Sequence, residues 1–155
     1  MDFRIRGLDP ARFARYFRMS DAELARHRAV RCVADSKPGF PCRVALADVD
    51  PGNPVILLNY EHLPVETPYR ASHAIYVSGA DAPFDEVGVV PSALRTRLLA
   101  VRAFDAHGMM VDADLVEGRE ADSLFSRWLG RGEVSYLHAH FARRGCFAAR
   151  VERAN

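Results

Sequence analysis

Two pairs of apolar segments, each joined by a short polar turn, dominate the second half of the chain. They are residues 98–104 with 109–116, and residues 134–141 with 146–151. Apolar runs of this length with a glycine in the connection, here Gly108 and Gly145, are typical of β-hairpins. No strand–helix–strand series of the doubly wound type accompanies them. The sequence therefore predicts an α+β fold with a mostly antiparallel sheet.

One amphipathic helix, near residues 119–129, separates the two hairpins. Its apolar side chains recur at helical spacing and are Ala121, Leu124, Phe125, Trp128 and Leu129. Asp9 and Ser20 each have the sequence context of a helix cap, which predicts a helical segment near the N-terminus. A chain of 155 residues can bury one sizeable core, so residues 1–155 are expected to form a single domain.

Shorter strands are predicted in the first half of the chain. They are residues 2–6, 29–33, 73–77 and 87–90. Residues 44–47 and 55–59 are expected to pair as a hairpin across the turn at 50–53. Residues 61–72 are polar and contain two prolines, which predicts a loop.

The composition narrows the classes of function. The net charge is +1, from 21 basic and 20 acidic residues, so a nucleic-acid partner is not expected. No glycine-rich phosphate loop is present, and no cofactor is expected. Without a secretory signal or an apolar run of membrane length, and with three cysteines at wide spacing, the chain is expected to be a reduced cytoplasmic protein that does not bind membranes. A small anionic ligand and a second copy of the chain are the remaining candidate partners.

Cys42 is the first candidate catalytic residue. It follows a loop stiffened by prolines and precedes Arg43, whose positive charge could activate a thiol. Adjacent residues of a strand point to opposite faces, however, so a small buried group without chemistry is the alternative. His138 and Cys146 are the other candidate catalytic residues.

His138 and His140 lie two positions apart and would share one face of a strand, as the start of a metal site. No third ligand follows at short spacing, so a metal is not expected from the sequence alone. If His140 pairs with Phe147 across the hairpin, Cys146 faces the other way. If Gly145 sits in a bulge, His140 pairs with Cys146 and the two share a face.

Arg102 interrupts an apolar strand, and a buried guanidinium needs a partner. It is an anion clamp, half of an ion pair with Asp112 or Asp114, or an arginine on the solvated side of the sheet. A one-residue bulge at Gly108 would bring the two aspartates onto its face. The candidate ligand-binding residues are Arg43, Tyr69, His73 and Arg102. The remaining histidines, which are His27, His62 and His107, are expected to be solvated.

Several short motifs occur in an order that resembles one known family. They are Pro-Gly-Phe-Pro-Cys-Arg at 38–43, Pro-Tyr at 68–69, His-Ala-Ile-Tyr-Val at 73–77, Arg-Ala-Phe-Asp at 102–105, Gly-Met-Met at 108–110 and Gly-Cys-Phe at 145–147. Together they resemble the bacterial domain-of-unknown-function family 1203. The resemblance implies a single-domain cytoplasmic bacterial protein and carries over no catalytic residue.

The interpretation we favour from the sequence is a non-catalytic module that binds a small molecule or forms a homodimer. The first alternative is an enzyme or sensor that acts on a small anionic metabolite through Cys42 and His138, with arginines holding the anion. The second alternative is a metal site at His138 and His140. No feature of the sequence decides between an enzyme and a binding protein.

Overall fold

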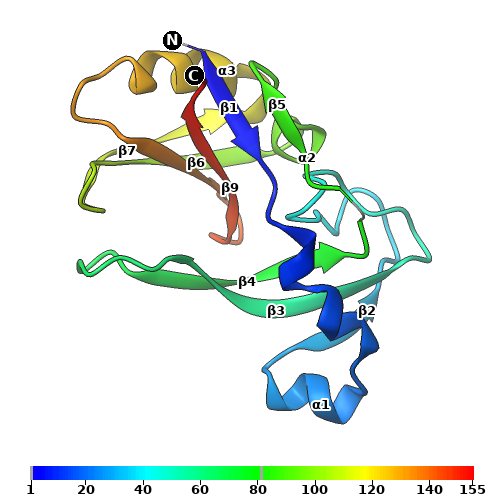
Figure 1. The fold of residues 1–155 in the computed structure, drawn as a ribbon. Coiled ribbons are helices and arrows are strands. Elements are labelled where there is room, and N and C mark those ends of the chain that lie inside the picture. The colour runs from blue at the N-terminus through cyan, green and yellow to red at the C-terminus, as the bar shows by residue number, and fades with distance from the viewer. Residues whose placement is uncertain (1, 81) are drawn as a thin grey trace.

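The computed structural model describes residues 2–80 and 82–155 and contains two antiparallel sheets (Figure 1). The strands are β1 (Phe3–Arg6), β2 (Val30–Val33), β3 (Pro54–Leu63), β4 (Ala71–Ser78), β5 (Asp85–Val87), β6 (Leu98–Phe104), β7 (Met110–Glu117), β8 (Tyr136–Phe141) and β9 (Phe147–Arg153). Six of them form one sheet in the order β5-β1-β9-β8-β6-β7, and the other three form a sheet in the order β2-β3-β4. This arrangement confirms the predicted α+β class.

Short helices join and cover the strands. They are α1 (Asp21–Arg26), α2 (Ser92–Arg95), α3 (Ala121–Leu129) and the 3₁₀ segments η1 (Pro10–Arg12), η2 (Ala14–Arg18) and η3 (Gly118–Glu120). The predicted caps form, because Asp9 accepts a bond from the Ala11 amide and Ser20 accepts one from the Glu23 amide. Within the described residues, no helix is long and apolar enough to span a membrane.

Helix α3 covers one face of the six-stranded sheet (Figure 1). Its side chains Leu124, Phe125 and Trp128 are buried in the main core, and the ring of Phe125 meets that of Phe3 edge to face at 5.5 Å. The opposite face of this sheet turns toward the three-stranded sheet, and side chains of the two sheets meet between them (Figure 1). The predicted helix is therefore confirmed, and it leaves the other sheet face for a second layer.

Both hairpins of the second half are confirmed, each with one irregularity. In the β6–β7 pair, Arg102 lies opposite Ala113, and the register shifts between Ala103 and Phe104. In the β8–β9 pair, His140 lies opposite Phe147, and the register shifts between Ala139 and His140. The pairing of His140 with Cys146, which stayed open in the sequence, does not occur.

The hairpin expected between residues 44–47 and 55–59 is wrong. Residues 44–47 form turns in which Leu46 has a φ of +52°, outside the extended region. The Val44 and Leu46 carbonyls accept bonds from the Phe84 and Ala93 amides, so they are not available to a ladder with β3. Strand β3 pairs instead with β2 and β4.

The predicted loop at 61–72 is also too long. Strand β3 continues to Leu63 and β4 begins at Ala71, which leaves only residues 64–70 as the connection. The short strand expected at 87–90 lies at Asp85–Val87 instead.

Replacement of Leu124 by alanine tests the docking of α3. Leu124 is 4% exposed, so removal of its buried side chain should lower the free energy of unfolding by about 2–5 kcal/mol. The matched control is Leu115→Ala on β7, because Leu115 is 60% exposed and its loss should cost less than about 0.5 kcal/mol. Urea denaturation measures both, and equal losses would contradict the packing of this helix.

Candidate metal centre

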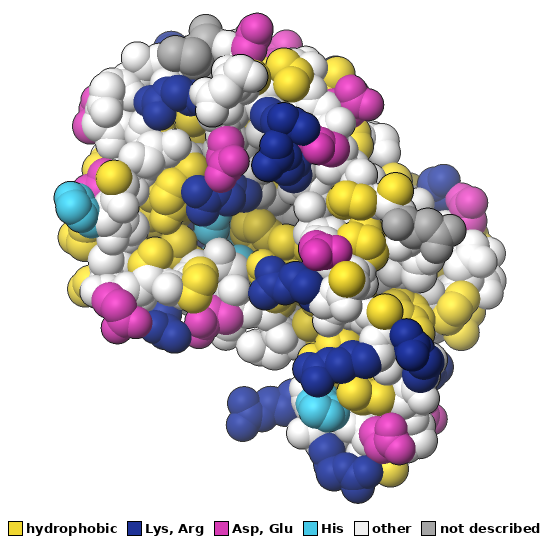
Figure 2. All heavy atoms as spheres, in the orientation of Figure 1, with side chains coloured by type: hydrophobic (Ala, Val, Ile, Leu, Met, Phe, Trp, Pro, Cys, Tyr) yellow, Lys and Arg dark blue, Asp and Glu magenta, His cyan; other side chains and the backbone are white. Residues whose placement is uncertain are grey.

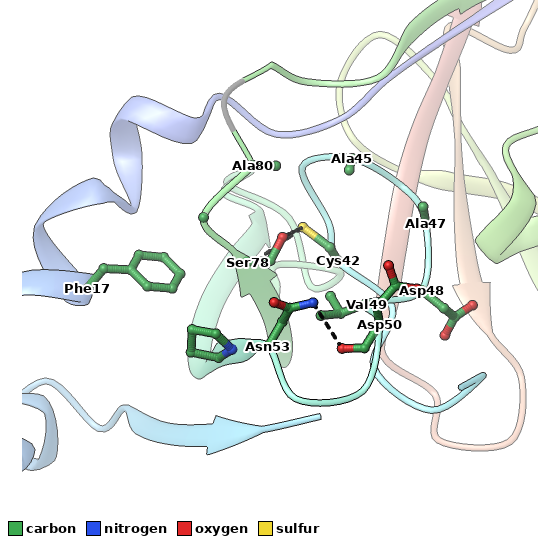
Figure 3. A pocket seen from close by; sticks show the side chains of 12 residues that line it. Phe17, Cys42, Ala45, Ala47, Asp48, Val49, Asp50, Asn53, Ser78 and Ala80 are labelled. Carbon is green, nitrogen blue, oxygen red and sulfur yellow. Dashed lines mark hydrogen bonds between the residues drawn. The ribbon is translucent and has the colours of Figure 1, made fainter. Parts of the chain in front are cut away.

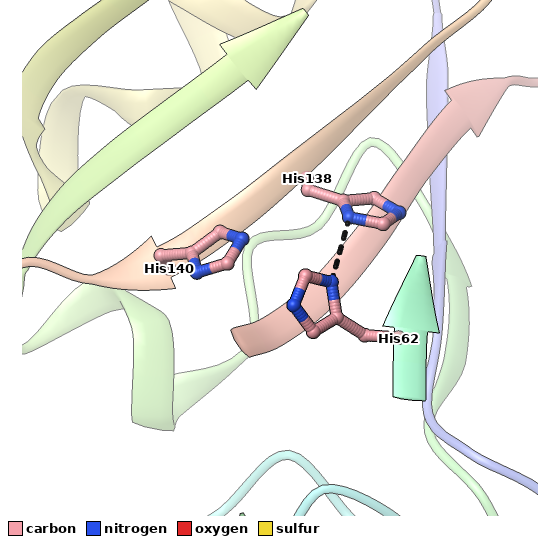
Figure 4. A group of neighbouring side chains, drawn as sticks. All are labelled: His62, His138 and His140. Atoms are coloured by element: carbon pink, nitrogen blue, oxygen red, sulfur yellow. Dashed lines mark hydrogen bonds between the residues drawn. The ribbon is translucent and has the colours of Figure 1, made fainter. Parts of the chain in front are cut away.

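Four histidines from both sheets meet in the space between the sheets. His138 and His140 project from the same face of β8, as their spacing predicted, and His62 approaches them from β3 (Figure 4). His73 on β4 stacks against His62 with ring centroids 4.8 Å apart. The β3–β4 register shifts between Tyr60 and Leu63, and such irregularities commonly re-aim a side chain. His62 lies in that stretch.

Hydrogen bonds connect three of these histidines and fix the fourth. Nε2 of His62 lies 2.7 Å from Nδ1 of His73, and Nδ1 of His62 lies 3.4 Å from Nδ1 of His138. Nδ1 of His140 bonds the Gly145 carbonyl at 2.9 Å. Its other ring nitrogen, Nε2, is buried without a partner, and no other buried side-chain nitrogen or oxygen of the described residues is left so. An unpartnered buried polar atom is costly and calls for a physical explanation.

Apolar rings surround the cluster and keep its imidazoles neutral. Phe147 stacks on His62 at 5.0 Å with the two planes 5° apart, and Phe104 lies 5.3 Å from His138. Burial, helped by neighbouring positive charges, lowers the pKa of His62 to about 4 and that of His138 to about 2. Burial likewise lowers the pKa of His140 to about 3. At neutral pH the imidazoles are therefore in the uncharged form that binds metals.

Arg102 lies beside the cluster, directly across the β6–β8 ladder from His138. Its positive charge lowers the pKa of all four histidines, and partial burial lowers its own pKa. Asp112 and Asp114 lie opposite Ala103 and Val101, and hence on the other face from Arg102. Asp112 pairs with Arg131 instead. No salt bridge to Arg102 forms within the described part of the chain, so the ion-pair alternative for Arg102 does not occur.

The cluster has the dimensions of a metal site. His62, His138 and His140 each offer a nitrogen, and these three atoms lie within 4.8 Å of one another. Zinc–nitrogen bonds of about 2.0–2.1 Å put two ligands of a tetrahedral site about 3.4 Å apart, the distance found between Nδ1 of His62 and Nδ1 of His138. Figure 2 shows histidine atoms at the base of a hollow edged by basic side chains on this face of the molecule.

Cys42 does not join this cluster. Its side chain is 1% exposed, and its sulfur accepts a bond from the Ser78 hydroxyl at 3.1 Å (Figure 3). The Val44 amide also donates to this sulfur. It lies in the wall of a separate cavity of about 420 Å³. A small buried group with local hydrogen bonds is the outcome that the alternative interpretation of Cys42 expected.

Cys146 and Arg43 meet each other at the β8–β9 turn. Because His140 pairs with Phe147, Cys146 faces away from the histidines. Its sulfur lies 3.1 Å from Nη2 of Arg43, whose side chain is 1% exposed. Both residues line a cavity of about 900 Å³, and His73 lines the same cavity. The structure therefore groups the predicted residues into two neighbouring sets. One is the histidine cluster with Arg102, and the other is the pair formed by Arg43 and Cys146.

Tyr69 stays outside both sets. It is 37% exposed and meets Phe104 edge to face at 6.4 Å.

His62 is the residue that sequence reasoning missed. It was expected to be solvated but is 7% exposed and contacts His73, His138 and His140. The available signal was the alternation from Leu58 through Tyr60 to His62, which continues one strand face into the segment that the prolines suggested was a loop.

The fold and the cluster define an α+β protein with a histidine-lined space between two antiparallel sheets. A family model described as "Protein of unknown function (DUF1203)" matches residues 39–153, and the chain belongs to this family. The match includes all four histidines and confirms the resemblance seen in the motifs. No curated protein and no solved structure matches the chain significantly.

The depressed histidine pKa values predict acid sensitivity of the metal-free protein. The unfolded chain takes up protons below the ordinary histidine pKa of 6.5, whereas the folded chain resists uptake until about pH 4 for His62 and about pH 2 for His138. Stability is therefore complete above about pH 6.5 and falls as the pH drops, by about 1.4 kcal/mol per pH unit for each proton withheld.

Urea denaturation across pH 7 to 4.5, in the presence of a chelator, measures this slope. His138→Gln removes one such group, so its stability should fall less steeply than that of the wild type, by up to about 1.4 kcal/mol per pH unit. His107→Gln is the control, because His107 is exposed and should keep the wild-type slope. A slope that is identical in His138→Gln and wild type would contradict the neutral buried cluster.

Proposed function

We propose that this protein binds a divalent transition metal ion through His62, His138 and His140, and that the ion holds a small anionic ligand. The observation that carries the proposal is the buried, unpartnered Nε2 of His140 beside the other two imidazoles. A lone pair without a hydrogen-bond partner, next to two further neutral nitrogens, is the arrangement that a metal ion satisfies.

The hydrogen bonds assign one free nitrogen to each ring. Because Nδ1–H of His140 donates to the Gly145 carbonyl, Nε2 carries the lone pair. If Nε2–H of His62 donates to His73, then Nδ1 of His62 is the free atom facing His138. Backbone carbonyls and side chains that hold the second ring nitrogen in this way typically orient metal-binding histidines. His73 therefore acts as a positioning residue for His62.

Nδ1 of His138 is the third ligand atom. Without metal, its proton is shared with Nδ1 of His62 across 3.4 Å. Binding of an ion at Nδ1 would move that proton to Nε2 of the same ring, so the imidazole stays neutral and no proton is released to solvent. Three neutral imidazoles suit Zn²⁺, Cu²⁺, Ni²⁺ or Fe²⁺, and three protein ligands leave one position of a four-coordinate zinc ion open.

Charge balance supports an anion at the open position. The three-residue ligand group contains only histidines, and Arg102 adds a positive charge next to His138. A divalent ion there has no negative partner from the ligand set, so a carboxylate, phosphate or hydroxide would supply it. An open metal position beside an arginine agrees with the small anionic ligand inferred from the sequence. A cytoplasmic location, where the three free thiols stay reduced, and homodimer formation remain part of the proposal.

Zinc binding to the metal-free protein tests the site. Isothermal titration at neutral pH should show one zinc ion bound per wild-type chain. His140→Ala removes a ligand and should abolish tight binding. His73→Ala removes only the positioning bond to His62 and should weaken binding by about 10–100-fold. Circular dichroism of each metal-free variant verifies that it is folded.

His107→Gln is the matched control, because His107 is exposed and is not one of the proposed metal ligands. It should bind zinc as the wild type does. Cobalt substitution adds a readout, because the visible spectrum distinguishes four-coordinate from six-coordinate nitrogen sites. Zinc binding that is equally tight in wild type and His140→Ala would overturn the proposal, as would a wild type that binds no zinc.

A further inference from the structure

The buried guanidinium of Arg43 is the second feature that needs an explanation. Its side chain is 1% exposed, and its nitrogens donate to the Phe147 carbonyl at 2.8 Å, to the Pro41 carbonyl at 2.7 Å and to the Cys146 sulfur at 3.1 Å. None of these is a carboxylate, and no salt bridge to Arg43 forms among residues 2–80 and 82–155. Burial of a charge without an opposite charge is costly, and the Cys146 sulfur is the one contact atom that can become negative.

Other positive groups line the same cavity. Arg143 and Arg144 are exposed on the β8–β9 turn, and within the described residues neither forms a salt bridge. Arg97 also lines the cavity, but Asp48 holds it in a bidentate pair. Of the described residues in the lining, Glu117 is the only acidic one. The cavity of about 900 Å³ therefore presents a net positive lining to any molecule that reaches Cys146.

Cys146 is accessible where Cys42 is not. It is partly exposed and lines the cavity wall, whereas Cys42 is 1% exposed and hydrogen-bonded by Ser78. A thiolate next to a cation and open to solvent has the surroundings of reactive cysteines. A positively lined cavity also concentrates anionic reagents at its base.

We propose that Cys146 is a reactive thiol that exchanges with anionic disulfides admitted by the basic cavity. The Cys146 thiolate, whose proton has gone to solvent, attacks one sulfur of the disulfide. A new S–S bond forms as the old one breaks, and the second sulfur leaves as an anionic thiolate. Cys146 is oxidised to a mixed disulfide, and one half of the incoming disulfide is reduced to a thiol.

Two aromatic disulfides of different charge test the proposal. 5,5′-Dithiobis(2-nitrobenzoate) carries two carboxylates, whereas 2,2′-dithiodipyridine is neutral at neutral pH, and stopped-flow absorbance follows both. All proteins carry Cys32→Ser, so that Cys146 is the only thiol with an exposed surface. The parent protein should show one fast equivalent with the charged reagent, and the further change Cys146→Ser should remove it.

The arginine variant separates cavity charge from thiol exposure. Arg143→Gln with Arg144→Gln alters only exposed side chains and should slow the charged reagent at least about tenfold, with less than a twofold change for the neutral one. High salt should slow the charged reagent in the parent and have little effect in the double variant.

Arg43→Lys keeps the positive charge next to Cys146. It should retain the fast phase at a reduced rate, because lysine cannot reproduce the three directed bonds. A fast phase that survives Cys146→Ser, or a double variant that slows both reagents equally or neither, would overturn the proposal. None of these outcomes depends on zinc when a chelator is present, so the test is independent of the metal centre.

Discussion

Strand β8 is buried along its whole length on both faces, and the rest of the structure depends on that constraint. Leu137, Ala139 and Phe141 face the main core together with α3. His138 and His140 point the other way, into the space between the sheets (Figure 4). A sheet face of this kind normally carries apolar side chains, because each buried polar group must find a partner. The second sheet supplies those partners, through His62 directly and through His73 by way of His62.

One buried nitrogen of this cluster has no hydrogen-bond partner, which favours a role in ligand binding over a purely structural role. His62 and His138 satisfy each other, and the Gly145 carbonyl satisfies one nitrogen of His140, but the other nitrogen has none. A core selected only for stability would fill this position with an apolar side chain, since replacement of both partners of a buried polar pair by apolar groups can be nearly neutral. A ligand that binds only the folded state adds its binding free energy to stability. In the proposed site, a metal ion would offset the cost of three buried imidazoles.

The sequence indicated the local elements and left the long-range contacts open. Both late hairpins, helix α3 and strand β1 rest on periodicities and turn residues that act over a few positions. The three-stranded sheet was harder to predict, because a turn near Pro51 looks the same whether its flanks pair with each other or with other strands. His62 shows the consequence. Two prolines suggested a loop, although the first, Pro64, follows the last residue of β3 and so lies outside the strand.

The site depends on which face of one sheet meets which face of the other, and alternation of residues along a strand does not contain that information. His138 and His140 could be placed on one face because their spacing is two. The strand that would face them lies about 70 residues earlier, and no local pattern links the two. In the same way, the choice between Phe147 and Cys146 as the partner of His140 rested on a one-residue shift, which reverses the face of every side chain beyond it.

The β8–β9 turn connects the two proposed sites through adjacent residues. Gly145, with a φ of +78°, places its carbonyl on Nδ1 of His140, and the next residue presents its sulfur to Arg43. A residue with a side chain would be strained in this conformation. Glycine at this position allows its carbonyl to bond His140 while the side chain of Cys146 lines the cavity. A metal on Nε2 of His140 makes Nδ1–H a stronger donor and tightens its bond to the turn. The position of Cys146 in the cavity is then determined by the same hydrogen bond that orients His140 toward the ion.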